Sequence, residues 1–103
     1  MKHFLIQYRR EHGTPEAWHE EVKRFTTALD NDAELADRIA YRCMAGGASQ
    51  AYVNIATVMD DQANKILQSR EYFQHYTAEV KRVSGGKVEV SPFSTVAETK
   101  RQA

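Results

Sequence analysis

The segment that decides the fold is "ATVMDDQANKILQSREYFQHYTAEVKRVSG", residues 56–85. It begins with an apolar run, passes two aspartates that can cap a helix, and then carries an apolar side chain at every third or fourth position. Glycine at the end of the segment is a common helix terminator. The segment therefore predicts a strand followed by an amphipathic helix whose core-facing stripe is Phe73, Tyr76, Val80 and Val83.

His75 lies outside this stripe. At roughly 100° per residue it is rotated about 160° from Phe73 around the helix. It shares a polar arc with Glu79 and Arg82. We therefore expect Phe73 and Tyr76 to face the sheet and His75 to face water. A catalytic His75 is the alternative.

The residues before the segment begin with a strand and a helix. Residues 3–9 alternate partly between apolar and polar side chains, which predicts a strand. Thr14 is a good N-cap and Pro15 suits the first helical position. Apolar residues then recur after four, three and four positions, which predicts an amphipathic helix to about Leu29.

Three more segments have strand patterns. Residues 38–44 and 50–59 predict two strands that form a hairpin with a longer, glycine-containing loop. Residues 87–96 predict a last strand, which we place at a sheet edge because Pro92 cannot donate a backbone hydrogen bond.

The resulting order of strands and helices predicts an α+β, ferredoxin-like βαββαβ fold, with a four-stranded antiparallel sheet and two helices on one face. We expect a single domain over residues 1–96 and a polar tail over residues 97–103. Leu5, Ala40 and Met44 fall on the face of the sheet that the helices leave open. Because a monomer would expose this patch, we predict a homodimer joined through the sheet faces.

Composition narrows the function classes. The 14 basic residues equal the 14 acidic ones, so no global charge attracts nucleic acid or a membrane surface. Cys43 is the only cysteine, which rules out an intramolecular disulfide and a cysteine-rich zinc site. Glu16 and His19 have a ligand-like spacing, but no second set accompanies them, so we expect no metal. With no signal peptide or long apolar run, a cytoplasmic protein is expected.

An aromatic set with polar tips has two open interpretations. Large rings of this kind can line a ligand pocket, or they can fill a dry core. If a pocket forms, Gln7, Asn54 and His75 are the candidate catalytic or polar contacts. The aromatic set comprises Trp18, Tyr41, Tyr52, Phe73 and Tyr76.

The strand and helix order, the chain length and residues 56–80 resemble the dimeric α+β barrel superfamily, and within it the antibiotic-biosynthesis-monooxygenase-like domains. Members run from the third strand into a short helix, then through a Ser-x-x-aromatic step, here Ser69 to Tyr72, into a longer helix. The resemblance implies a homodimer with a ligand cavity between sheet and helices in each subunit. Its haem-degrading branch uses Asn, Trp and His where this chain has Gln7, Ile66 and Tyr76, so haem degradation is not expected.

Three functions compete. The first is a cofactor-free, monooxygenase-like enzyme that acts on a planar apolar or aromatic substrate, with no metal, haem or flavin. The second is a non-catalytic ligand-binding or regulatory module of the same fold. The third, RNA binding, lacks the basic and aromatic pattern on the third strand that such domains use.

Overall fold

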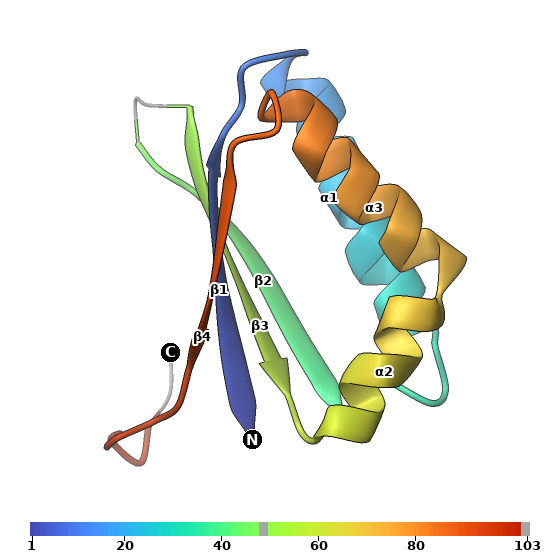
Figure 1. Ribbon diagram of the computed structural model, residues 1–103, viewed down its shortest axis with the longest axis vertical. Helices are drawn as coiled ribbons and strands as arrows, with labels where there is room; N and C mark the ends of the chain where they lie inside the picture. Colours follow the sequence, from blue (N-terminus) through green and yellow to red (C-terminus); the bar gives the residue numbers. More distant parts are fainter. Residues whose placement is uncertain (48–49, 102–103) are drawn as a thin grey trace.

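The computed structural model describes residues 1–47 and 50–101. A four-stranded antiparallel sheet lies against one layer of helices (Figure 1). This arrangement confirms the predicted ferredoxin-like α+β fold, except that the second predicted helix is divided in two. In chain order the elements are β1 (Lys2–Arg9), α1 (Pro15–Asp30), β2 (Ile39–Ala45), β3 (Ala51–Val58), α2 (Asp61–Ser69), α3 (Glu71–Val83) and β4 (Val88–Phe93).

The strand order in the sheet is β2-β3-β1-β4. β4 therefore lies at an edge, as the proline in it predicts. Pro92 pairs with Phe4 of β1, and its missing N–H costs nothing on the open side. Residues 48–49, in the predicted loop between β2 and β3, and residues 102–103 of the predicted tail lie outside the described residues.

Arg70 separates α2 from α3, where the sequence pattern alone predicted one continuous helix. Its backbone is extended, with φ −77° and ψ 132°. In an unbroken helix, Tyr76 would point about 220° away from Ala63, so the two could not both face the sheet. The interruption brings both into the core, where Ala63 is 0% and Tyr76 2% exposed. The resemblance to the barrel superfamily did imply such a step.

The helix ends follow their expected chemistry. The Thr14 side chain accepts a hydrogen bond from the Ala17 N–H and caps α1, while Asp60 caps α2 by accepting from the Ala63 N–H. Gly85 and Gly86, with φ of 65° and 83°, turn the chain sharply from α3 into β4.

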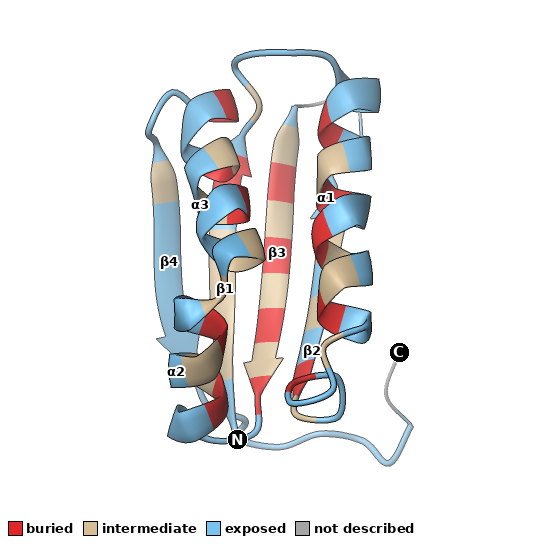
Figure 2. Cartoon of the chain, turned by 90° about the vertical axis from the view of Figure 1, so that its right-hand side faces the viewer, coloured by how far each residue is buried: buried red, intermediate tan, exposed pale blue. Residues whose placement is uncertain are grey.

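The core lies between the sheet and the helices (Figure 2). α1 contributes its predicted stripe, and α3 contributes Tyr76, Val80 and Val83. Alternate residues of the central strand β3 are buried on the same side. The buried residues of α1 are Trp18, Val22, Phe25 and Leu29.

The opposite face of the sheet carries no helix (Figure 1). We call it the outer face. Leu5, Val53 and Ile55 are half-buried on it, while Met44 and Phe93 remain 40% and 53% exposed. Leu5 and Ile55 lie opposite each other on adjacent strands, so these apolar side chains are contiguous. Within the described residues, no helix combines the length and apolar character needed to cross a bilayer.

Candidate functional site

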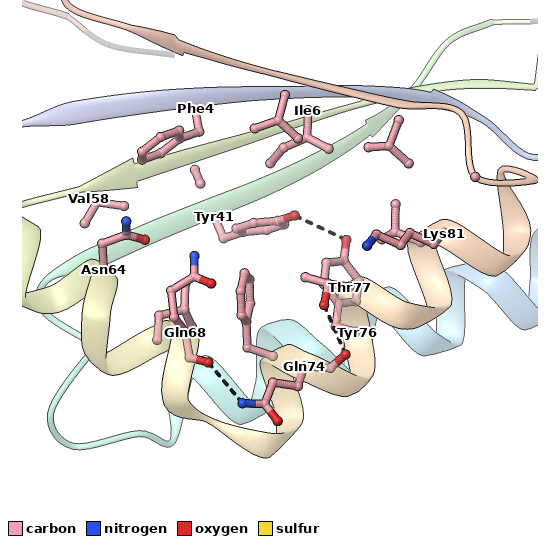
Figure 3. Close-up of a pocket in the computed structure, with 17 residues that line it drawn as sticks. Phe4, Ile6, Tyr41, Val58, Asn64, Gln68, Gln74, Tyr76, Thr77 and Lys81 are labelled. Atoms are coloured by element: carbon pink, nitrogen blue, oxygen red, sulfur yellow. Dashed lines mark hydrogen bonds between the residues drawn. The ribbon is translucent and has the colours of Figure 1, made fainter.

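A cavity of about 500 Å³ lies between the sheet and helices α2 and α3 (Figure 3). This volume falls in the range of roughly 300–1,000 Å³ that is usual for small-molecule sites. Its sheet side is apolar, and its helix side adds a few polar groups. The lining residues include Phe4, Ile6, Val58, Val88 and Val90 from the strands, and Asn64, Leu67, Gln68, Phe73, Gln74, Tyr76, Thr77, Val80 and Lys81 from the helices.

The position of the cavity follows from how the helices cover the sheet. α1 lies over the β2 side, and α2 and α3 lie over β1, so that β4 extends beyond them at the edge (Figure 2). Val88 and Val90 of β4 line the cavity, and Val90 is 59% exposed. The cavity therefore extends to the surface along this edge.

Behind the cavity, Asn54 organises a buried polar network. Its side chain is 0% exposed, and its Nδ2 donates to the hydroxyl oxygens of Tyr41 and Tyr76, at 2.9 Å each. The Tyr41 hydroxyl donates to that of Tyr76 at 3.4 Å (Figure 3). The Tyr8 hydroxyl donates to Asn54 Oδ1 at 3.4 Å and accepts from Trp18 Nε1 at 3.2 Å. An amide buried in this way fixes the hydroxyls at one end of the cavity.

Aromatic packing holds the same hydroxyls from the other side. The Tyr76 ring stacks on Phe25 with centroids 4.1 Å apart, and on Trp18 at 5.9 Å. Tyr41 meets both Phe25 and Tyr76 edge-on. Rings packed in offset and edge-to-face geometry have little freedom to move. The polar end of the cavity is therefore preorganised before any ligand arrives.

Burial keeps these tyrosines protonated. Desolvation raises the pKa of Tyr41 to about 12, even though the hydrogen bond that it accepts from Asn54 acts against the rise. Desolvation also raises the pKa of Tyr8 and that of Tyr76. At neutral pH these groups donate hydrogen bonds and do not act as bases. In the described part of the chain, no carboxylate or imidazole lines the cavity, and Lys81 is its only charged side chain.

The structure divides the predicted aromatic set. Tyr41, Phe73 and Tyr76 line the cavity. Trp18 and Tyr52 do not: Trp18 packs behind Tyr76, and the Tyr52 hydroxyl bonds His19 Nε2 at 2.9 Å. Three rings of the set therefore line this cavity, and the other two are buried outside it.

Two of the three candidate polar residues, Gln7 and His75, do not line this cavity. Gln7 is exposed on the outer face, because successive residues of a strand point to opposite sides and its neighbour Ile6 lines the cavity. The His75 side chain is 57% exposed, as its helical position predicted, and its Nε2 lies 2.7 Å from Glu21 Oε1. Asn54 contacts the cavity only through the Tyr41 and Tyr76 hydroxyls.

The helices also supply polar lining residues that the sequence patterns did not single out. Thr77 and Lys81 are four residues apart on α3, next to the apolar stripe. Positions that flank a stripe are usually solvated, so only the wide spacing between α3 and β4 makes them part of a cavity wall. Asn64, Gln68 and Gln74 join the cavity in the same way from the α2–α3 region.

One group could offer ligands to a metal ion. The ligand atoms of Glu21, His75 and Glu79 lie within 4.8 Å of one another, between α1 and α3. Sequence spacing could not reveal this group because Glu21 belongs to another helix. Both carboxylates also have arginine partners: Arg24 lies 2.9 Å from Glu21, and Arg82 lies 2.5 Å from Glu79. The arrangement is accounted for as a surface ion-pair network.

No protein-family model matches the chain, and no curated protein matches its sequence. Solved structures match it over nearly its whole length. A mutant of SnoaB, a cofactor-independent oxygenase from Streptomyces nogalater, is 15% identical with a TM-score of 0.78, and 97% of each chain is covered. An antibiotic biosynthesis monooxygenase is 17% identical with a TM-score of 0.66, covering 94% of this chain and 100% of the other. Rv0793 from Mycobacterium tuberculosis is 11% identical with a TM-score of 0.67, covering 96% and 98%. This chain therefore has the same fold as this cofactor-independent oxygenase and this antibiotic biosynthesis monooxygenase.

Proposed function

We propose that this chain, with the fold of the antibiotic-biosynthesis-monooxygenase-like proteins, is a small-molecule enzyme that oxygenates a planar apolar or aromatic substrate without a cofactor. The observation that carries the proposal is the cavity of about 500 Å³, which is apolar along the sheet and ends in the fixed hydroxyls of Tyr41 and Tyr76. A similar overall structure in a cofactor-independent oxygenase supports it.

The residues of the cavity suit a reaction in which the substrate supplies the electrons. In such a reaction a substrate methylene group becomes a carbonyl, one atom of O₂ enters the product, and the other leaves as water with the two hydrogens. The protein then needs to orient the substrate, stabilise the oxygen that becomes negative as the substrate loses a proton, and exclude water. Neutral tyrosine hydroxyls can donate to that oxygen, and the apolar walls exclude water.

The test is oxygen consumption with a planar tricyclic ketone that carries an acidic methylene group, such as anthrone. Added protein should raise the rate of oxygen uptake above the spontaneous rate. Thr77→Trp, which places an indole in the cavity, should remove the increase. Ala78→Trp, at the neighbouring exposed position of α3, should retain it. Equal rates with both variants and the parent would contradict a reaction in this cavity.

A non-catalytic ligand-binding module is the second candidate function. The absence of a carboxylate or imidazole among the described lining residues favours it, because such a group is the usual base for proton removal. Under this alternative, Thr77→Trp abolishes binding of an aromatic ligand, but the parent protein consumes no oxygen with any substrate of the class.

The oligomeric form that we propose is a homodimer in which two outer faces pack against each other. On the outer face, apolar side chains of adjacent strands are contiguous, and Met44 and Phe93 protrude from it. Contiguous apolar surface of this kind is typical of a contact between subunits. In this arrangement the helices, and with them the cavities, lie on the outside of the dimer.

A further inference from the structure

At its polar end the cavity has a hydrogen-bond donor without an acceptor. Both hydrogens of Asn54 Nδ2 are used, one on Tyr41 and one on Tyr76, and the Tyr41 hydroxyl hydrogen is also directed at Tyr76. The two hydroxyls share a single contact of 3.4 Å, in which only one of them can be the donor. Among the residues that the structure describes, at least one hydroxyl hydrogen of the Tyr41–Tyr76 pair therefore has no acceptor. A buried donor without a partner is costly, so a ligand acceptor at this point would be favoured.

A positive charge accompanies this donor. Lys81 is an exposed residue of α3 that lines the cavity, and its amino group is turned toward the Tyr76 side in Figure 3. Its ammonium group forms no ion pair with any carboxylate of residues 1–47 and 50–101. The neighbouring cation of α3, Arg82, pairs instead with Glu79 on the helix surface. Lys81 is therefore available to a bound molecule.

The surroundings favour an anion in this position. No acidic side chain lines the described part of the cavity, so nothing there repels a negative charge. The neighbouring walls are apolar, and charge–charge attraction is stronger beside apolar protein than in bulk water. The Tyr41 and Tyr76 hydroxyls stay protonated, because burial raises the pKa of each. The hydroxyl hydrogen that has no acceptor is therefore one more donor for the same anion.

We infer that the ligand of this cavity carries an anionic oxygen, as a carboxylate, enolate or phenolate, which is bound by the Lys81 ammonium and a hydroxyl of the Tyr41–Tyr76 pair. This inference rests on the proposed function, and it identifies the substrate class as acidic planar aromatics bound in the ionised form. Binding of the ionised form lowers the pKa of the bound acidic group. The acidic group releases its proton to bulk water, and Lys81 stabilises the electron-rich anion that reacts with oxygen, without a protein base in the cavity.

The test compares two ligands of nearly equal shape, 2-naphthoate and 2-naphthamide, of which only the first is charged. Binding is followed by ¹H–¹⁵N NMR titration of the parent protein and of three variants. Trp18 is the only tryptophan and stacks on Tyr76, so its single indole N–H signal reports on the cavity. Lys81→Met removes the charge and Lys81→Arg keeps it. Lys65→Met is the control, because it removes an exposed lysine of α2 that does not line the cavity.

The parent should bind 2-naphthoate more tightly than 2-naphthamide. Lys81→Met should weaken 2-naphthoate binding about tenfold, as expected for the loss of a charge-assisted hydrogen bond, and leave 2-naphthamide unchanged. Lys81→Arg and Lys65→Met should bind both ligands as the parent does. Equal binding of the two ligands by the parent, or equal effects of Lys81→Met on both, overturns the anionic class while leaving the cavity as a ligand site. If neither ligand shifts the cavity signals, the inference is overturned together with the proposed function.

Discussion

Replacing Asn54 with leucine tests the polar network behind the cavity. Asn54 is fully buried in the central strand β3, and leucine keeps a branched side chain at that position while removing both the amide donor and the amide acceptor. The change takes away the amide that contacts the hydroxyls of Tyr8, Tyr41 and Tyr76. We expect a large loss of stability without a change of fold.

The magnitude follows from the hydrogen bonds. Two donations from Nδ2 have a length of 2.9 Å, and each contributes about 1 kcal/mol net. The contact from Tyr8 to Oδ1, at 3.4 Å, is long and is left out of the sum. Tyr41 and Tyr76 keep each other as partners at 3.4 Å, so the penalty for unsatisfied hydroxyls is about 1 kcal/mol, at the low end of its range. Asn54→Leu should therefore lower the free energy of unfolding by about 3 kcal/mol.

Urea denaturation followed by tryptophan fluorescence measures this change. Parent and variant are compared at one protein concentration, because dimerisation would make the midpoint concentration-dependent. With a slope of about 1.5 kcal/mol per molar urea, the midpoint should fall by about 2 M. Gln62→Leu, at an exposed position of α2, is the control and should change the free energy by less than about 0.5 kcal/mol.

A double-mutant cycle separates the network from the effects of shape. If Asn54 binds Tyr41 as described, Asn54→Leu should cost about 1 kcal/mol less in a Tyr41→Phe background, because one of its hydrogen bonds is already lost. Equal costs in both backgrounds, or an Asn54→Leu protein as stable as the parent, would refute the network as the source of the stabilisation.

Three further predictions concern helix α3, the buried tyrosines and the outer face. Phe73→Ala should lower the free energy of unfolding by about 2–3 kcal/mol, less than for a fully buried ring because Phe73 is half-buried. His75→Ala should lower it by less than about 0.5 kcal/mol because the His75 side chain is 57% exposed. Equal losses in chemical denaturation would contradict the assigned helix orientation. Burial raises the pKa of Tyr41 from 10.0 to about 12, so the folded state retains a proton that the unfolded chain releases, and stability should be constant below about pH 10 and fall as the pH rises toward 12. Absorbance at about 295 nm, read beside the unfolding midpoint, checks this sign, and stability that rises above pH 10 would contradict it. For the parent protein, light scattering coupled to size exclusion should give about twice the 11.8 kDa chain mass. Ile55→Lys, on the outer face, should give the chain mass itself. A monomeric parent would contradict the proposed dimer.

By itself the sequence determined the four strands, the helical regions and most of the residues that they bury, but its periodicity did not show the break at Arg70. The spacing of Trp18, Val22, Phe25 and Leu29 predicted the buried stripe of α1, and the spacing in residues 73–83 predicted that of α3. Alternation in the strands separated the cavity side from the outer face. These properties follow from two local periods, about 3.6 residues for a helix and 2 for a strand, and both are visible in a single chain.

Only the tertiary structure decided where the cavity lies and which side chains line it. Local periodicity says that Gln7 and Asn54 point in opposite directions, but it does not say which of the two meets a tyrosine hydroxyl. Asn54 of β3 meets Tyr41 and Tyr76 because β2 and α3 pack beside it, although these two residues are 13 and 22 positions away in the sequence. Lys81 lines a cavity because β4 extends past the helices at the sheet edge. Both are consequences of how whole elements pack, since distances between segments remote in sequence are set by the volume of the core and not by any local pattern.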